Sequence, residues 1–323
     1  MLLTALAVAA IQPGDLKIHG DWIAGCDNGR VCQAVSLMPA GDFEAATIAV
    51  KRGAEANAPL EVWITAREGE PAEVRVDGKR FALIARGEDL APQQPAQLVA
   101  AIVAGKRAAL FDRQGKQIAA LSVAGASAAL LYVDEQQRRL GTTTALVRRG
   151  ARPASAVPAA PPLPVIDVAA GSPKPARALA KADLEAARKD SACEKPEEEG
   201  APERFRLDAR STLALVPLRC GSGAYNFLSV ALILDERGRA SPARFDVQGD
   251  PGADNLIYGA DWDPKSRRLG TYFKGRGIGD CGISQSYAWD GARFRLVEQS
   301  EMGECRGSID YITTWRAGVR ERR

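Results

Sequence analysis

Six cysteines constrain the fold of this chain more than any other feature of its sequence. Cys26 and Cys32 flank a segment of Asp, Asn and Gly that favours a tight turn, so we expect them to form a disulfide. The other four allow three pairings among themselves: they are Cys193, Cys220, Cys281 and Cys305. Pairing nearest neighbours predicts Cys193–Cys220 and Cys281–Cys305, and each bond would stabilise the fold by about 3 kcal/mol.

Metal binding by these cysteines is the alternative to disulfides. Zinc sites favour closely spaced Cys-x-x-Cys pairs or Cys combined with His, and no two cysteines here have that spacing. His19 is the only histidine, and a redox-active thiol pair would also need the Cys-x-x-Cys spacing. We therefore expect no metal and no other cofactor.

The N-terminus indicates export from the cytosol. Residues 1–10 are apolar with small side chains (MLLTALAVAA), which is typical of the end of a signal peptide. We assign residues 1–11 to an incomplete signal peptide, because the usual preceding Lys or Arg is missing and a start codon assigned too far downstream would explain this. Together with an even number of cysteines, this predicts a periplasmic or secreted protein. A buried first strand or helix is the alternative.

Charge and hydropathy exclude two classes of partner. The net charge is only +3, which is too small to imply a nucleic-acid partner. After the N-terminus no segment reaches the roughly 18 consecutive apolar residues that span a bilayer, so we expect no membrane span in the mature chain.

A stretch rich in proline and alanine divides the chain. Residues 149–178 contain prolines too frequent for a helix or a central strand, and we interpret this stretch as a linker that holds two halves apart. The predicted domains are then residues 12–148 and 179–317, followed by a basic, solvated tail at 318–323.

Hydrophobic periodicity predicts a mainly β fold with a few helices. Strand-like alternation occurs at residues 18–24, 46–51, 61–67, 73–76 and 80–85, and again at 212–218, 227–234, 243–247, 269–273 and 294–297. Helical patterns occupy residues 95–104, 127–140 and 181–190. Asp77-Gly78 is a candidate hairpin turn. The pattern indicates a β-rich α+β protein with two sandwich-like domains, each stapled by disulfides and joined by the linker.

Four motifs resemble those of the domain-of-unknown-function 1176 family of exported bacterial proteins. They are GDWIAGCDNGRVC (20–32), VPLRCGSGAYN (216–226), KGRGIGDCG (274–282) and MGECRG (302–307). The first half is also similar, more weakly, to the invasion-associated locus B proteins. These resemblances imply export and disulfides, but no reaction.

The best candidate site is the glycine-rich loop at 274–280. Lys274, Arg276 and Asp280 lie among three glycines whose backbone N–H groups are available to hold an anion. The loop lacks the Walker and dinucleotide-binding spacings. The structural alternative is a turn leading into the Cys281 bridge, with Arg276 paired to Asp280.

Other residue sets give weaker signals. Carboxylates are plentiful in the second half, where turn positions are their usual role: Asp261, Asp263, Asp280, Asp290, Glu301 and Glu304. Five tryptophans are expected in the core: Trp22, Trp63, Trp262, Trp289 and Trp315. We therefore expect a binding protein for a polar or anionic envelope ligand, or for a protein partner. One alternative is an envelope hydrolase using Asp280 and Glu304, with two carboxylates about 5 to 10 Å apart in a cleft. Another is a structural adaptor.

Overall fold

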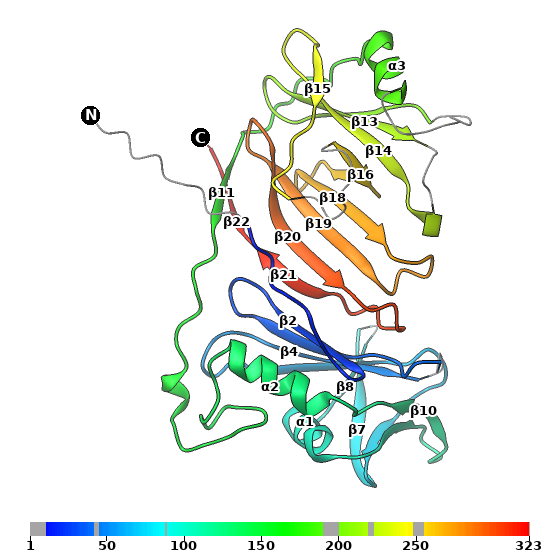
Figure 1. The fold of residues 1–323 in the computed structure, drawn as a ribbon, viewed down its shortest axis with the longest axis vertical. Helices are drawn as coiled ribbons and strands as arrows, with labels where there is room; N and C mark the ends of the chain where they lie inside the picture. Colours follow the sequence, from blue (N-terminus) through cyan, green and yellow to red (C-terminus); the bar gives the residue numbers. More distant parts are fainter. Residues whose placement is uncertain are drawn as a thin grey trace.

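The computed structural model describes residues 11–41, 45–87, 89–189, 200–218, 223–247 and 255–322. The fold is mainly β, with several sheets and three α-helices in this part of the chain (Figure 1). We call the residues up to 148 the first half and those from 179 onward the second half. None of the helices in the described residues is long and apolar enough to cross a membrane.

The first half is built on one ten-stranded sheet in the order β1-β2-β3-β4-β5-β8-β7-β6-β9-β10. Its strands are β1 (Lys17–His19), β2 (Trp22–Cys26), β3 (Cys32–Ser36), β4 (Thr47–Arg52), β5 (Leu60–Thr65), β6 (Glu73–Val76), β7 (Lys79–Arg86), β8 (Asp89–Pro92), β9 (Ala108–Phe111) and β10 (Gln117–Leu121). A bridge between Ala46 and Leu121 connects the end of β10 back to the start of β4. The path of strands from β4 to β10 therefore closes on itself around a shared core.

Local turn chemistry explains several of these elements. Asp77 and Gly78 both have positive φ (46° and 86°), which gives the tight mirror-image turn that joins β6 to β7 and confirms the predicted hairpin. The predicted strand at 18–24 is instead a hairpin, because Gly20 (φ 60°) reverses the chain between β1 and β2.

Two helices cover the first-half sheet, and one is shorter than predicted. α1 (Pro95–Ala104) has the predicted bounds, with proline in its first turn and Gly105 after its end. α2 (Ala126–Gln136) packs on β2 and β3. It ends before Leu140, the predicted end, because Arg138 adopts a left-handed conformation (φ 57°).

The second half is a sandwich of two sheets. One sheet contains β12 (Glu203–Arg206), β13 (Thr212–Leu218), β14 (Leu228–Leu234), β15 (Ala240–Pro242) and β16 (Leu256–Tyr258). The other has the order β17-β18-β19-β20-β21 and contains β17 (Asp261–Asp263), β18 (Arg268–Lys274), β19 (Gly282–Trp289), β20 (Phe294–Met302) and β21 (Ile312–Arg316). Leu213 and Leu215 of β13 pack toward Trp262 and Tyr287 in the core between the sheets. The alternate residues of β13 pack toward α3 (Lys181–Lys189), so this strand is buried on both faces.

One predicted strand of the second half is absent. Residues 243–247 form no strand, and only a single bridge joins Phe245 to Phe294. Phe245 still packs beside the inter-sheet core, stacked on Phe294 at a centroid distance of 5.2 Å. The apolar residues in 243–247 therefore reflect burial of this segment, and they do not indicate a paired strand.

The segment interpreted as a spacer does not hold the halves apart. Within it, β11 (Val165–Val168) pairs in parallel with β22 (Gly318–Glu321), as Figure 1 shows. Ile166 and Val168 turn inward and pack around Ala288. Most of the tail that we expected to be solvated is therefore a strand.

The halves contact each other directly. Ile23, Val35 and Leu37 of the first half share a buried cluster with Met302 and Ile312 of the second. β21 lies against β2 and β3 (Figure 1).

Polar contacts reinforce this interface. Asn28 Nδ2 donates to Arg316 O (2.9 Å), and Arg316 N donates to Asn28 Oδ1 (2.8 Å). Trp63 Nε1 donates to Asp310 Oδ1 at 2.6 Å. We correct the spacer interpretation accordingly.

Two predicted disulfides are confirmed. Cys26–Cys32 joins facing residues at the ends of β2 and β3, with 4.0 Å between the Cα atoms. Cys281–Cys305 joins Cα atoms 4.7 Å apart. Cys193 and Cys220 lie outside the described residues, as do residues 1–10 of the predicted signal peptide.

Candidate binding surface in the second half

Four large apolar side chains stand exposed on three loops of the second half. The exposed fractions are 72% for Tyr225, 69% for Phe227, 62% for Ile278 and 60% for Ile309. We call the loops 223–227, 274–281 and 303–311 the loop cluster. Elsewhere in the described residues, Ile18, Ile84 and Val165 are the other exposed large apolar residues. The loop cluster therefore concentrates exposed apolar surface in one region.

Asn226 fastens the first of these loops to the second. Its side chain is 5% exposed. Its Oδ1 accepts a hydrogen bond from Lys274 N and its Nδ2 donates to Lys274 O, both at 2.8 Å. The two hydrogen bonds resemble those between paired residues of neighbouring β-strands. They hold Tyr225, which has a φ of 61°, beside Gly277. A Cβ on Gly277 would lie 3.2 Å from the Tyr225 ring, so the absence of a side chain there lets the ring pack closely.

Arg276 and Asp280, two residues of the predicted anion loop, are paired with each other. Arg276 Nε donates to Asp280 Oδ1 at 2.6 Å, and Nη2 donates to Oδ2. Gly307 N also donates to Oδ2, at 2.7 Å, and only 1% of the Asp280 side chain is exposed. Burial raises the pKa of Asp280, but the bonds from Arg276 and Gly307 outweigh it, so the pKa lies below its ordinary value. The guanidinium charge of Arg276 is thus already matched, and anion binding by this loop stays a prediction.

Beside the loop cluster lies a hollow of about 540 Å³ floored by hydroxyl groups. Register places Tyr272, Ser284, Ser300 and Thr313 in one row across β18, β19, β20 and β21. The hollow is lined by Gly259, Asp261, Gly270, Thr271, Tyr272, Gly279, Ser284, Ser300, Ile309 and Tyr311. Gly279 and Ile309 come from the loop cluster, so its exposed rim and the hollow form one continuous surface.

Two tyrosines fix the wall of the hollow. The hydroxyls of Tyr272 and Tyr311 lie 3.0 Å apart, and both donate to Gly279 O, at 3.0 and 3.2 Å. Burial raises the pKa of Tyr311, so its hydroxyl stays neutral. Lys274 Nζ, the third candidate of the sequence analysis, lies 5.6 Å from the centre of the Tyr272 ring.

Two of the six second-half carboxylates serve turns. Asp263 accepts from Lys265 N and Ser266, and Asp290 accepts from Ala292 N and Arg293 N. Hydrogen bonds, first that from Ser266, lower the pKa of Asp263. Burial raises the pKa of Glu301. Among the six carboxylates of the sequence analysis, only Asp261 lines the hollow.

The arrangement of these carboxylates supports neither the hydrolase alternative nor a metal site. Both oxygens of Asp280 accept hydrogen bonds from Arg276 and Gly307, and only 1% of its side chain is exposed, so this carboxylate is poorly placed to act on a substrate. Across the part of the chain that the structure describes, no three His, Cys, Asp or Glu side chains are grouped to hold a metal ion.

The tryptophans lie mainly in the interior. Trp22, Trp262 and Trp289 are at most 6% exposed, which is the core role expected for them. Trp63 and Trp315 are half-buried and donate to Asp310 and to Leu296 O.

The sequence identified one loop of this surface and missed the rest. Ile278 lies between two glycines of the loop singled out, but Ile309 and Tyr311 lie in a segment with no motif of their own. Tyr225 and Asn226 belong to a quoted motif, yet nothing local reveals that Asn226 bonds a residue 48 positions away. Exposure and long-range pairing become visible only in the fold.

Comparison with known proteins places the chain in a family. A family model described as "Protein of unknown function (DUF1176)" matches residues 16–318, which include all four motifs. The chain is 30% identical over 331 residues to the uncharacterized protein YpfG of Escherichia coli (strain K12), covering 93% of this chain and 92% of that protein. The chain belongs to the DUF1176 family of proteins of unknown function.

Proposed function

We propose that this chain is an exported, non-catalytic binding protein whose loop cluster binds a partner protein. The observation that carries the proposal is the group of four exposed large apolar side chains on loops held in place by covalent and polar bonds. Clustered exposed apolar surface with a polar rim is typical of protein–protein contact sites.

The chemistry of the surface favours a protein over a small anion. Arg276 is engaged by Asp280, so it contributes little attraction for a negative charge. Ile278 and Ile309 offer only apolar area, which suits apolar side chains of a partner. The hydroxyl-floored hollow beside them is large enough to receive a side chain and satisfy its polar groups.

Rigidity of the loops supports the same proposal. The Cys281–Cys305 disulfide, the Asn226 pairing and the Arg276–Asp280 ion pair fix the loops before any partner arrives. A preformed surface loses less conformational entropy on binding, which strengthens association. Disulfides persist in oxidising compartments, so the two in the described residues support export.

A photo-crosslinking experiment tests the proposed function. A photoreactive amino acid at Phe227 should capture a specific partner in the cell envelope, whereas the same probe at Ile84 should not. The captured protein is then purified, and its affinity is measured for the wild type and for Phe227→Ala, Ile278→Ala and the control Ile84→Ala. We expect at least about tenfold weaker binding for Phe227→Ala or Ile278→Ala and no change for the control. Equal affinities for all four proteins, or no capture at Phe227, would overturn the proposal.

A further inference from the structure

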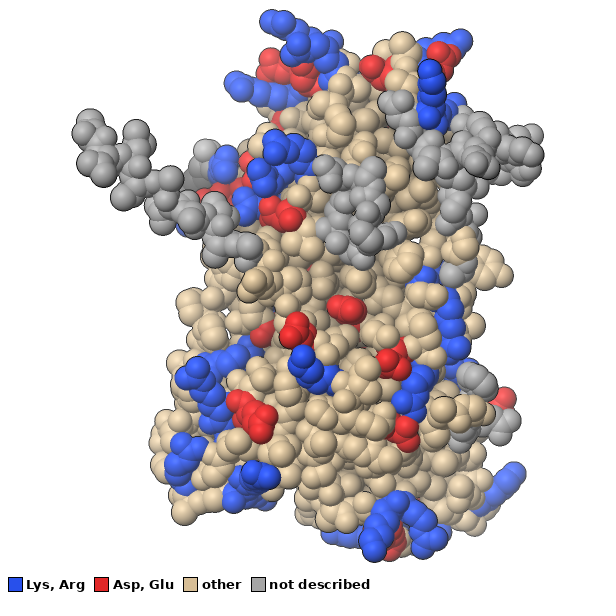
Figure 2. All heavy atoms as spheres, viewed as in Figure 1, with Lys and Arg blue, Asp and Glu red and all other residues tan. Residues whose placement is uncertain are grey.

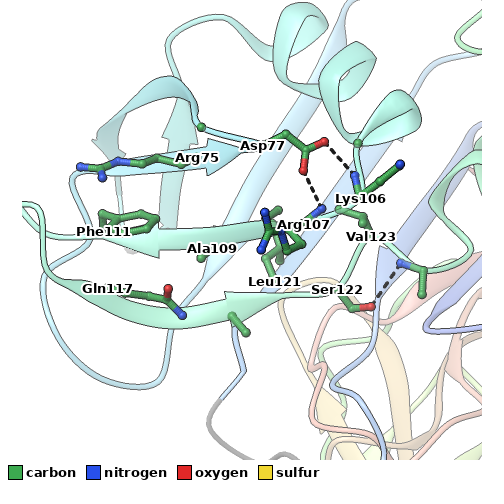
Figure 3. Close-up of a pocket in the computed structure, with 15 residues that line it drawn as sticks. Arg75, Asp77, Lys106, Arg107, Ala109, Phe111, Gln117, Leu121, Ser122 and Val123 are labelled. Atoms are coloured by element: carbon green, nitrogen blue, oxygen red, sulfur yellow. Dashed lines mark hydrogen bonds between the residues drawn. The ribbon is translucent and has the colours of Figure 1, made fainter.

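A second hollow lies on the first half and shares no lining residue with the hollow beside the loop cluster. It has a volume of about 850 Å³ and is formed by β6, β9 and β10 together with the turns at their ends (Figure 3). The opposite face of these strands carries Val74, Val76 and Leu110, which belong to the core. The strands are therefore anchored by their inner face, and their outer face is free to bind.

Small side chains form the floor of this groove. Ala109 on β9 faces Ala120 on β10. Side chains alternate along a strand, so Arg107, Ala109 and Phe111 point to the same outer face. The span from Arg107 to Phe111 is roughly 13 Å at about 3.3 Å per residue. The alanines thus leave an open trough between larger residues at its two ends, as Figure 3 shows.

Cationic side chains lie at both ends of the trough. At one end, the Arg75 guanidinium lies 4.0 Å from the centre of the Phe111 ring and is held by Glu73 at 2.6 Å. At the other end, Lys106 and Arg107 leave the chain from one turn (Figure 3). Asp77 fixes that turn, because its oxygens accept the backbone N–H groups of Lys106 (2.9 Å) and Arg107 (3.1 Å).

Carboxylates match the positive charges of the groove only in part. Its lining holds three cations and the single carboxylate of Asp77. Glu73 is shared between Arg75 and Arg80, so one carboxylate serves two guanidinium groups. Within the described ranges, Lys106 and Arg107 take part in no ion pair. Figure 2 shows charges of both signs mixed over much of the visible face, with basic side chains gathered at its lower end, beyond β7.

Another hollow in the second half provides a contrast. It is lined by Arg210, Arg237, Arg239 and Arg244. There, however, Arg210 pairs with Glu236 at 3.1 Å and Arg239 pairs with Asp235 at 2.8 Å. Within the described residues Arg237 and Arg244 form no ion pair, so unmatched charge occurs there too. The first-half groove differs in its shape, because a trough of small side chains separates Arg75, held against Phe111, from Lys106 and Arg107 on one turn.

We propose that the groove binds a small ligand that carries two or more phosphate or carboxylate groups. One anionic group would meet Arg75, another would meet Lys106 and Arg107, and the body of the ligand would lie over Ala109 and Ala120. Guanidinium groups bind such oxygens through two parallel hydrogen bonds. Arg75 is held in advance by Glu73 and Phe111, so little side-chain freedom is lost on binding.

Titration calorimetry with two probes tests this proposal. Tripolyphosphate and citrate are titrated into the oxidised full chain at about 50 and about 200 mM salt, which changes the screening of exposed charges. We expect one of them or both to bind, more weakly at higher salt. The double variant Lys106→Ala/Arg107→Ala should weaken binding at least tenfold, and Arg237→Ala, which removes one cation from the other hollow, should leave it unchanged.

A second variant separates a shaped site from general attraction to positive charge. Ala109→Leu keeps the net charge but fills the trough, so it should weaken binding as strongly as the double variant. Thermal unfolding of each variant verifies that the fold is retained. If neither probe binds, or if Ala109→Leu binds as well as the wild type, the proposal is wrong. Binding of one probe alone assigns phosphate or carboxylate recognition to the groove.

Discussion

At the scale of single residues, Asp280 links two of the sequence motifs. Its carboxylate accepts hydrogen bonds from Arg276 in its own loop and from Gly307 N in the segment after Cys305. The disulfide Cys281–Cys305 joins the same two segments, one residue after Asp280 and two residues before Gly307. Gly275 is required beside it, because a Cβ there would lie 2.7 Å from Cys281 Sγ. The loop cluster therefore depends on a few small, closely packed residues.

Replacing Asp280 by Asn tests this link. The pKa of Asp280 lies below the ordinary value of 3.8, so its ionised form stabilises the fold above about pH 4. That contribution is lost as the pH falls through the lowered folded-state pKa. We expect Asp280→Asn to destabilise the protein by about 2 kcal/mol near neutral pH, less than for a fully buried pair because Arg276 is partly exposed.

Urea unfolding at about pH 7 and about pH 3 measures this effect. The difference between wild type and Asp280→Asn should shrink at the lower pH, because the carboxyl group is then protonated in the unfolded chain and the free energy gained by ionising it in the fold decreases. Asp263→Asn is the control for an exposed turn carboxylate. A difference that is independent of pH would contradict the assigned role.

At the scale of elements, part of the connecting segment and part of the C-terminal tail pair with each other as strands β11 and β22. Ile166 is 9% exposed and faces Ala288, whereas its neighbour Val165 is 59% exposed. Arg320 adds a bond from its Nε to Asp167 Oδ1 at 2.7 Å. This strand pair covers part of the second-half sheet.

A matched pair of substitutions tests the packing of β11. Ile166→Ala should lower the free energy of unfolding by about 2 kcal/mol, because it removes buried apolar volume. Val165→Ala on the same strand should change it by less than about 0.5 kcal/mol, since that side chain faces solvent. Denaturant unfolding of both variants measures the difference. Equal effects would show that β11 behaves as an unpacked linker.

Elements that depend on local signals were predicted from the sequence, and those that depend on distant partners were not. The β6–β7 hairpin follows from Asp77-Gly78, and α1 follows from Pro95 and Gly105. β11 and β22 are four residues each and pair across 153 positions of the chain, so neither shows a pattern of its own. The site divides in the same way. Arg276 and Asp280 are four residues apart and their pairing was an explicit alternative, whereas the Asn226–Lys274 pairing had no local signal.

At the scale of the whole molecule, the two halves form one braced unit. Arg306 Nε donates to Met38 O at 2.9 Å and its Nη2 donates to Asp21. Arg316 Nε donates to Asp27, next to the Asn28 contacts. With the shared apolar cluster, these bonds join both ends of β21 and its preceding loop to the first half.

Cleavage of the connecting segment tests this brace. A protease recognition sequence inserted after Ala160, in an exposed stretch, allows the purified protein to be cut once. The two fragments should elute together in gel filtration, because their contacts do not depend on the connection. Asn28→Ala, which removes two bonds to Arg316, should promote their separation. If the two fragments of the cleaved wild-type protein elute separately from each other, the halves do not share a core.

The contact between Asn28 and Arg316 also has a consequence for folding, because we expect it to form late. These residues are 288 positions apart, so their contact closes a loop of nearly the whole chain. Such closure is slow, because the chain loses much entropy before the contact forms. Until β21 arrives, Ile23, Val35, Leu37 and Ala49 have no cover from the second half. A chain in which β21 has not yet packed therefore exposes an apolar face on β2, β3 and β4, and exposed apolar surface of this kind is prone to aggregation during folding.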